Sequence, residues 1–317
     1  MVFPLLLVVV VLGAAALLPA DAQAGVMPPD GAAGEPANAD WQWQRLEVAR
    51  RDGQGQLHLH LAIPRRPAPA AGWPALWMLD GNAARMALDP AQLQALARGQ
   101  PPLLVFVSPP APVRIDGPAR TRDFTPVPMA ATEPGQAAQG GHAATFLAEL
   151  EGPLRQAVAA HVALDGRQQA LWGHSLGGLF TLYAYYRRSP AFTSYFAASP
   201  SLWWGNGWLL GAPEQQFLAA GPAGARLLIL QGGNEARSSG TRTDRSPAQV
   251  QAQRARQAAV APDAARQLAQ RLGAADPGAV AYVELAGLGH GPMLPASLRR
   301  VVHQLAASLD PEIDDEP

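Results

Sequence analysis

Residues 171–180, LWGHSLGGLF, place one serine between two glycines inside an apolar stretch. In a Gly-x-Ser-x-Gly pattern the serine stands at the tip of a sharp turn from a strand into a helix, and its hydroxyl projects from the turn. The strand and the helix nearly touch on either side of this turn. Positions 173 and 177 are therefore expected to require a very small residue, and both are glycine. An apolar strand before the motif and an amphipathic helix after it favour a nucleophile over a structural turn. We therefore predict that Ser175 is a nucleophile.

A serine nucleophile needs a base, and two histidines follow the helix that Ser175 would begin: His290 and His303. In this arrangement an acid and then a histidine follow the serine along the chain, with the histidine on a loop after the last strand. His290 lies between glycines directly after an apolar strand at 280–287, whereas His303 falls inside a predicted C-terminal helix. We predict that His290 is the base.

The acid that orients the histidine is expected after the strand 225–233. Glu235 stands there and is the first candidate, while Asp244 and Asp263 are alternatives. A Ser–His pair oriented by a backbone carbonyl is a further alternative.

Backbone N–H groups would hold the oxyanion that forms when a serine attacks an ester carbonyl. Leu176 is expected to begin a helix, whose N-terminus stabilises negative charge. A second donor is expected from the loop after the strand 74–80. There Asn82 follows Gly81, and we predict its N–H as that donor.

The elements that must position these residues alternate along the chain. Buried strands are predicted at 74–80, 102–108, 169–175, 192–199, 225–233 and 280–287, and helices at about 83–98, 176–188, 247–272 and 295–309. This alternation predicts an α/β fold with a mostly parallel central sheet and helices on both faces. Two alternating segments at 41–48 and 57–63 should add an antiparallel N-terminal edge. His58 and His60 would then face solvent.

The segment 109–141 is rich in proline and glycine and has no periodicity. It is too long for an idle connection in a compact domain. It also follows the carboxyl end of a strand, where open α/β sheets place their ligand crevice. We predict a loop on the substrate side.

Composition bounds the class of protein. Of the 317 residues, 48% are hydrophobic and 15% are charged, and the formal net charge of −1 gives no sign of a nucleic-acid partner. The chain has no cysteine, which excludes disulfides, thiolate chemistry, cysteine-ligated metals and a lipoprotein anchor.

The N-terminus predicts export. The apolar stretch 3–18 has the length of a signal-peptide core, and small residues at 20–24 offer cleavage sites, although no Arg or Lys precedes it. Residues 1–24 are thus a signal peptide or an uncleaved anchor. We expect a periplasmic or secreted protein that meets a membrane only through an uncleaved segment. Residues 25–40 read as a linker, 41–309 as one catalytic domain, and 310–317 as an acidic tail.

The chain resembles the putative-esterase branch of the α/β-hydrolases. The resemblance rests on WMLDGNAA, ARTRDFTP, GGHAATFLAELEGPLR, LWGHSLGGLFTLYA, FTSYFAASPSLWW and GLGHGPML, which are spread over nearly all of 41–309. Within this branch the chain is similar to the trilactone siderophore esterases that cleave ferric enterobactin and salmochelin. The resemblance implies an α/β-hydrolase fold, Ser175 as nucleophile, His290 as base and an oxyanion hole at Asn82 and Leu176. In that family the acid is the least uniform element, and some members work as a Ser–His dyad.

The resemblance also implies arginines at the mouth that meet an anionic catecholate–iron complex. The candidates are Arg120 and Arg122, with Arg114 behind them; the alternative for Arg122 is an ion pair with the neighbouring Asp123. Trp203 and Trp204 follow a strand end, so a pocket-lining role and a packing role are both open.

These expectations converge on a serine esterase. Its expected substrate is a small-molecule ester, a catecholate trilactone siderophore whose iron arrives with it; no cofactor or resident metal is expected. The alternatives are a general carboxylesterase acting on acyl or feruloyl esters and a non-catalytic siderophore binder.

Overall fold

The computed structural model describes residues 39–130, 137–235 and 247–308. The predicted signal segment 1–24, nearly all of the linker, the acidic tail and Asp244 lie outside these residues, so the predictions made for them stay predictions. Within the described ranges, no helix combines the length and apolar character needed to cross a membrane.

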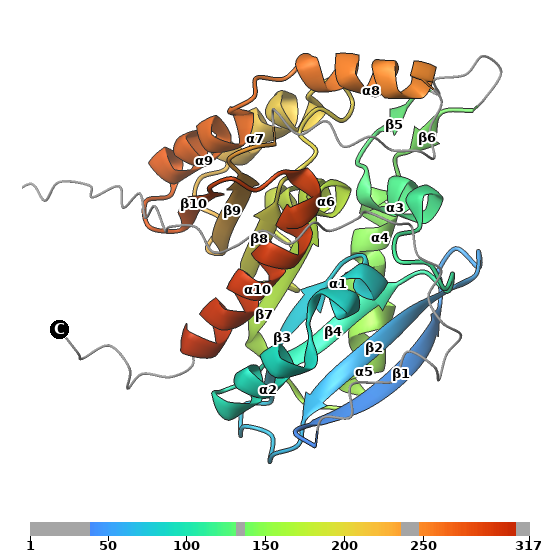
Figure 1. The fold of residues 1–317 in the computed structure, drawn as a ribbon, viewed down its shortest axis with the longest axis vertical. Helices are drawn as coiled ribbons and strands as arrows, with labels where there is room; N and C mark the ends of the chain where they lie inside the picture. The colour runs from blue at the N-terminus through green and yellow to red at the C-terminus, as the bar shows by residue number, and fades with distance from the viewer. Residues whose placement is uncertain (1–38, 131–136, 236–246, 309–317) are drawn as a thin grey trace, which may run out of the picture.

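One mixed sheet of eight strands organises the chain, in the order β1-β2-β4-β3-β7-β8-β9-β10 (Figure 1). The strands are β1 (Trp41–Ala49), β2 (Gln56–Pro64), β3 (Trp73–Met78), β4 (Leu103–Ser108), β7 (Leu164–His174), β8 (Ser194–Ala198), β9 (Arg226–Gly232) and β10 (Val280–Leu285). β2 pairs antiparallel with β1 and with β4, and all other neighbours are parallel. The predicted parallel sheet with an antiparallel N-terminal edge is confirmed.

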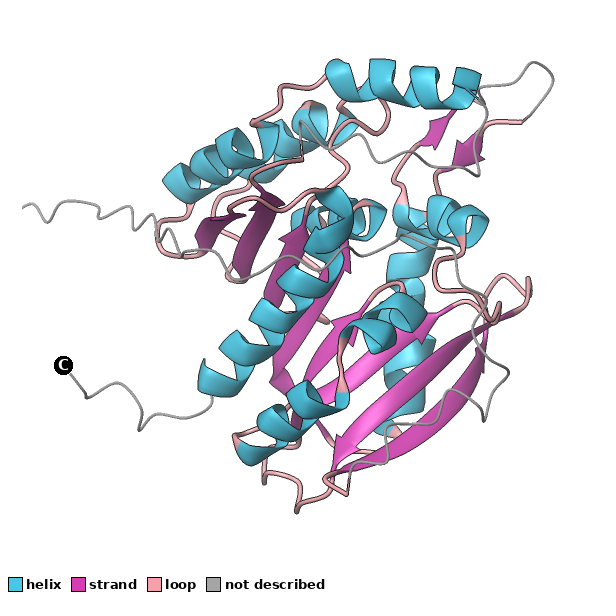
Figure 2. Ribbon diagram, viewed as in Figure 1, coloured by secondary structure: helices cyan, strands magenta, loops and turns pink. Residues whose placement is uncertain are grey.

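Helices cover both faces of this sheet, as the alternation predicts (Figure 2). The helices α1 (Gly81–Ala87), α2 (Pro90–Arg98) and α10 (His290–Ser308) pack on one face. The other face carries α3 (Gly117–Phe124), α4 (Ala143–Glu149), the π-helical turn η1 (Leu150–Leu154), α5 (Arg155–Ala159), α6 (Leu176–Tyr186), α7 (Ala212–Ala219) and α9 (Ala264–Ala275). The helix α8 (Pro247–Ala258) and the 3-10 turn η2 (Trp208–Leu210) complete the described helices.

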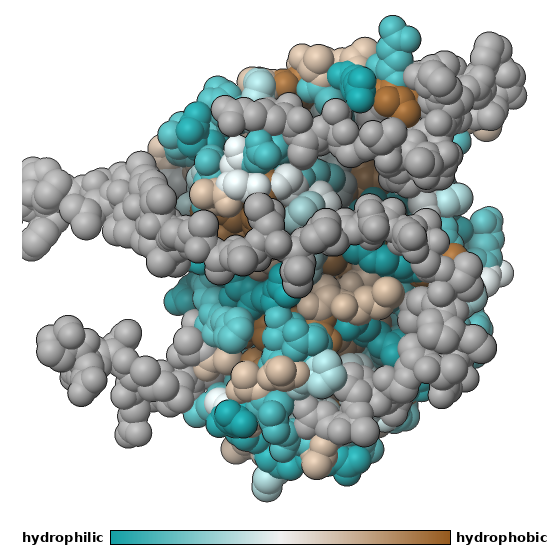
Figure 3. Space-filling view, in the orientation of Figure 1, coloured by the Kyte–Doolittle hydropathy of each residue, from teal (hydrophilic) through white to brown (hydrophobic). Residues whose placement is uncertain are grey.

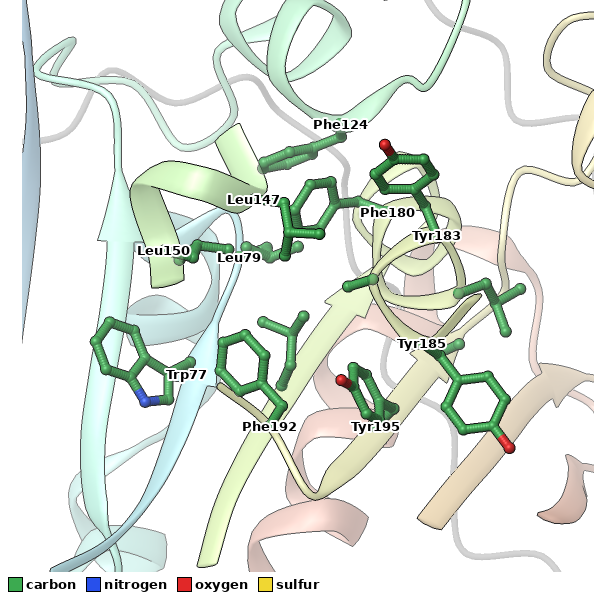
Figure 4. Packing of buried hydrophobic residues seen from close by; sticks show 14 of the residues in the cluster. Trp77, Leu79, Phe124, Leu147, Leu150, Phe180, Tyr183, Tyr185, Phe192 and Tyr195 are labelled. Carbon is green, nitrogen blue, oxygen red and sulfur yellow. The ribbon is translucent and has the colours of Figure 1, made fainter. Parts of the chain in front are cut away.

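Alternation along the strands divides the core into two layers. In β7, Leu171 enters the layer under α6, and Trp172 enters the layer under α10. Figure 4 shows Phe124 of α3 and Phe180 of α6 close together, with ring centroids 5.9 Å apart. Burying each such ring contributes about 1.5–3 kcal/mol, which fastens α3 to the core beside β7, the strand that ends directly before Ser175.

Two helices expected to be continuous are broken. The segment 83–98 divides into α1 and α2 because Asp89 caps a new helix: its carboxylate accepts from Gln92 N at 2.8 Å, and Pro90 follows it. The segment 247–272 divides into α8 and α9 around Pro262, since proline cannot continue a helix ladder.

The expectation that His58 and His60 face solvent is wrong. β2 lies between β1 and β4, and His58 is 7% exposed. His60 is half-buried, and Arg85 of α1 contacts its Nδ1 at 3.0 Å. The strict alternation therefore belongs to an interior strand whose polar side chains find protein partners.

The segment 109–141 is more structured than a loop. It holds α3, whose N-cap Asp116 accepts from Ala119 N at 2.9 Å, and the short antiparallel pair of β5 (Pro128–Met129) and β6 (Gln139–Gly140).

The molecular surface is a separate feature of the fold. The face in Figure 3 is mostly hydrophilic in its described part, with hydrophobic side chains in small patches. Among the described residues, Met86 is the one large hydrophobic side chain that is exposed.

Candidate active site

Ser175 connects β7 to α6 at the carboxyl end of the sheet. Its φ of 62° and ψ of −114° are a strained conformation for a residue with a side chain. The turn is held from both sides, because Ser175 N donates to Ala198 O at 2.9 Å and Leu179 N donates to Ser175 O at 3.0 Å. The strain is therefore imposed by β8 and α6, and it presents the hydroxyl at the edge of the sheet.

The glycines around Ser175 differ in whether a larger residue could take their place. A Cβ at Gly173 would lie 2.3 Å from the Gly177 carbonyl oxygen, so only glycine fits there. The expectation of a steric need at Gly177 is wrong, because a Cβ there would meet Leu79 at an ordinary 3.5 Å. The second tight position is Gly178, where a Cβ would lie 2.6 Å from Ala198 O.

His290 lies between Ser175 and Glu235. Its Nε2 is 3.0 Å from Ser175 Oγ, and its Nδ1 is 2.9 Å from Glu235 Oε2. A neutral imidazole in this position donates from Nδ1 to the carboxylate and accepts the serine proton at Nε2. His290 is the first residue of α10, which begins five residues before the predicted Pro295 because Pro292 is tolerated in a first turn.

Glu235 is held in its ionised form. Burial alone would raise its pKa, but hydrogen bonds from His290, Ser199 Oγ and Gly232 N, and the positive charge that His290 carries when it is protonated, lower that pKa below its usual value. Oε1 accepts from Ser199 at 2.5 Å and from Gly232 at 2.8 Å, which leaves Oε2 for the histidine. The alternative Asp263 is the N-cap of α9 and bonds to Arg266 and Gln267 instead.

The turns carrying acid and histidine are joined by backbone bonds. Gly233 N donates to Leu285 O, and Asn234 N donates to Leu288 O, each at 3.0 Å. A Cβ at Gly232 would lie 2.4 Å from Leu288 O, so the two turns are in close contact. This fixes the distance between Glu235 and His290.

His174, next to the nucleophile, is a support for the histidine. Burial lowers the pKa of His174 well below its usual range, and the charges of His290 and Arg120 lower it further. The neutral ring donates from Nε2 to the His290 carbonyl at 2.9 Å, with the two ring centroids 4.7 Å apart. His303, in contrast, is exposed on α10.

The predicted oxyanion donors stand at two neighbouring helix starts. Leu176 is the first residue of α6 and Asn82 the second of α1, where backbone N–H groups have no intrahelical acceptor. The side chain of Asn82 has its own task, which the sequence reasoning missed. Its Nδ2 donates to Val113 O at 2.9 Å and to Ala111 O at 3.2 Å, so it fastens the start of the 109–141 segment.

Arg120 connects the turn after β3 with the turn after β7. It donates to both Asp80 carboxylate oxygens, at 3.1 and 2.9 Å, and to the His174 carbonyl at 3.2 Å. Asp80 is 7% exposed and takes a left-handed φ of 49° directly before α1. The guanidinium predicted to meet substrate is thus engaged within the protein, between the turn after β3 and the turn after β7.

The other predicted contacts are also placed. Arg122 donates to Asp123 at 2.9 Å, the ion pair that the sequence left as an alternative, and keeps 31% of its side chain exposed. Arg114 is half-buried, and its charge acts on His174. Trp204 is buried and donates to Val127 O at 2.8 Å, whereas Trp203 beside it is half-buried.

The arrangement can activate a serine hydroxyl with a neutral imidazole and an ionised carboxylate. Backbone amides lie at the same edge for an oxyanion. Across residues 39–130, 137–235 and 247–308, no group of three His, Asp or Glu side chains is arranged to hold a metal ion.

Known proteins of similar sequence are ester hydrolases. The chain is 35% identical over 155 residues to the apo-salmochelin esterase of Escherichia coli O6:H1, covering 48% of each chain. It is 30% identical over 176 residues to the ferri-bacillibactin esterase BesA of Bacillus subtilis, covering 51% of this chain and 60% of that one. The matches thus span about half the length of these relatives.

A solved structure gives a wider match. The enterobactin and salmochelin hydrolase IroE superposes with a TM-score of 0.65 at 26% identity, covering 88% of this chain and 99% of the other. The family model described as "Putative esterase" matches residues 54–272, which include the nucleophile turn and Glu235. The chain therefore belongs to the putative esterase family.

Proposed function

We propose that this protein is a serine esterase whose substrate is a catecholate trilactone siderophore such as ferric enterobactin. The observation that carries the catalytic part is the line from Ser175 Oγ through His290 to Glu235, with contacts of 3.0 and 2.9 Å. The substrate class is supported by the named activities of its relatives.

The proposed mechanism uses these contacts. Ser175 Oγ attacks the lactone carbonyl while its proton passes to His290 Nε2, and the Asn82 and Leu176 amides hold the oxyanion. Glu235 stabilises the imidazolium that forms. The intermediate then expels the alkoxide, which takes the proton from Nε2. Water, deprotonated by His290, attacks the acyl-enzyme and releases Ser175 and the free acid.

A general carboxylesterase is the second candidate. It is favoured by one observation: Arg120 and Arg122, the predicted contacts for an anionic substrate, are already paired with Asp80 and Asp123. A neutral acyl ester would not need those arginines.

The deciding experiment compares hydrolysis of ferric enterobactin with that of p-nitrophenyl acetate, with Ser175→Ala as the control. We expect both esters to be cleaved by the wild type and neither by the variant. Cleavage of only the small ester would overturn the siderophore proposal, and equal turnover by the variant would overturn the nucleophile. Turnover of neither ester by the wild type, with siderophore still bound, would favour the non-catalytic binder.

We propose that the enzyme works outside the cytoplasm. The support is the apolar stretch 3–18 with small residues after it. Fractionation of cells expressing the full chain should recover it from the periplasm or medium if the segment is cleaved, and from membranes if it is kept. Recovery from the cytosol contradicts the proposal.

A further inference from the structure

The turn Ser199-Pro200-Ser201 follows β8 and lies between nucleophile and acid. Both serines are buried, at 2% and 3% exposed. Ser199 N donates to Leu230 O at 2.7 Å, and Ser201 N donates to Ser175 O at 3.0 Å, so the backbone ties this turn to β9 and to the nucleophile turn. Buried hydroxyls need hydrogen-bond partners, and both side chains find theirs in the proposed triad.

Ser199 contacts the acid. Its φ of 45° is uncommon for a residue with a side chain, and its Oγ is 2.5 Å from Glu235 Oε1. Because the carboxylate only accepts, the serine proton must lie in this bond. Together with Gly232 N, the hydroxyl occupies Oε1 and turns Oε2 toward His290.

Ser201 contacts the nucleophile. Its Oγ is 3.2 Å from Ser175 Oγ. Ser175 has one hydroxyl proton, which it donates to His290 Nε2 at 3.0 Å. The proton between the two serines therefore belongs to Ser201, which donates to Ser175 Oγ. This bond strengthens when Ser175 gives up its proton and its oxygen gains negative charge.

We propose that this turn completes the catalytic site. Ser201 is a further catalytic residue, whose hydroxyl donates to Ser175 Oγ during attack and again when that oxygen leaves the acyl-enzyme. Ser199 is a positioning residue, which acts through the Glu235 carboxylate. The inference rests on the proposed serine mechanism but does not depend on the siderophore as substrate.

The test measures how fast a fluorophosphonate probe labels Ser175, alongside p-nitrophenyl acetate hydrolysis. Ser201→Ala should lower both rates about tenfold, in the wild type and equally in the Glu235→Gln background. Ser199→Ala should lower them about fivefold in the wild type and not further in Glu235→Gln, because the carboxylate it orients is gone. Ser297→Ala, which removes a buried hydroxyl bonded to Leu294 O, is the matched control and should label at the wild-type rate.

A role limited to packing is separated by a spectroscopic readout. Ser199→Ala should move the low-field proton resonance of His290 Nδ1–H, while Ser297→Ala should not. If an alanine variant fails to fold, Ser199→Cys or Ser201→Cys replaces the hydroxyl with a weak donor of similar shape and should show the same losses.

Two results would overturn the inference: a Ser199→Ala loss that persists in Glu235→Gln, or Ser201→Ala labelling within about twofold of wild type. A wild type that is not labelled at Ser175 overturns it together with the serine mechanism. Ferric enterobactin is assayed separately, so failure there overturns the substrate proposal alone.

Discussion

Two regions meet at the candidate site and are held in different ways. The proposed triad stands at the ends of β7 and β9 and after β10, where backbone bonds between neighbouring turns set its spacing. The segment 109–141 is held mainly by side chains. The Asn82 amide bonds to its start, Asp123 of α3 pairs with the buried Arg50 at 2.6 Å, and Arg120 pairs with Asp80 at 2.9 Å.

The difference separates chemistry from support. Changes among the triad side chains should remove activity and leave the fold intact, since strand ends carry them. Changes in the Arg50–Asp123 and Arg120–Asp80 pairs should first reduce stability, because each removes an ionic partner from a buried charged group.

Loss of the nucleophile or the base should have the largest effect on rate. Ser175→Ala and His290→Ala should each lower kcat/KM for p-nitrophenyl acetate by about 10⁴-fold or more, with urea midpoints near wild type. His303→Ala, on the exposed side of the same helix, is the control for His290 and should hydrolyse at the wild-type rate. Activity in His290→Ala close to that of this control would contradict the base assignment.

Glu235→Gln should have the next largest effect on rate. It should lower kcat/KM for p-nitrophenyl acetate by about 10³-fold, because the amide cannot stabilise the imidazolium. Asp263→Asn is the matched control, since that carboxylate bonds only to its own helix, and its activity should not change. A loss of less than about tenfold in Glu235→Gln would favour a Ser–His dyad.

Arg120→Ala should chiefly reduce the free energy of unfolding, by about 3–5 kcal/mol, because it strands the buried Asp80 carboxylate. Arg122→Ala removes a partly exposed pair and should cost at most about 1 kcal/mol. Chemical denaturation measures both. Equal costs would show that the 109–141 segment does not depend on the Arg120 bridge.

Two glycines of the nucleophile turn offer a stricter comparison. Gly173→Ala forces a Cβ against Gly177 backbone and should destabilise the fold by about 3 kcal/mol. Gly177→Ala meets only ordinary contacts within a helix and should be neutral or stabilising by up to about 1 kcal/mol. Thermal unfolding of the two variants measures both effects. If Gly177→Ala were the less stable variant, the steric explanation for Gly173 would be refuted.

Two carboxylates, the half-buried Glu235 and the buried Glu149, should respond oppositely to pH. The pKa of Glu235 is lowered in the fold, so its contribution to stability is present above its unfolded value near 4.5 and is lost as pH falls through the folded pKa. Burial raises the pKa of Glu149, despite the nearby Arg50, so its ionisation reduces stability as pH rises above 4.5. Urea unfolding from pH 3 to 7 checks this. As pH rises, the free energy of unfolding of Glu149→Gln should increase relative to that of the wild type, and that of Glu235→Gln should decrease relative to it. The same trend in both variants would contradict these shifts.

The sequence indicated the sheet, its antiparallel edge and the positions of Ser175, Glu235 and His290. It could do so because those signals are local: an apolar run, a glycine-flanked serine, and a polar residue just past a strand end. Carboxyl ends of parallel strands share one edge of a sheet, so residues at those ends meet whatever the details of packing. The roles of these residues stay with the experiments above.

Tertiary structure alone decided which side chains support them. Arg120 finds Asp80 forty residues away, Asn82 fastens residues 111 and 113, and Ser199 and Ser201 meet Glu235 and Ser175. The spacing of residues along the chain does not predict such pairs, because each pair depends on how turns from different strands pack against one another. The amino-acid sequence by itself placed the reacting groups on one edge, and the packing of that edge determined the partners, charges and strain that hold them there.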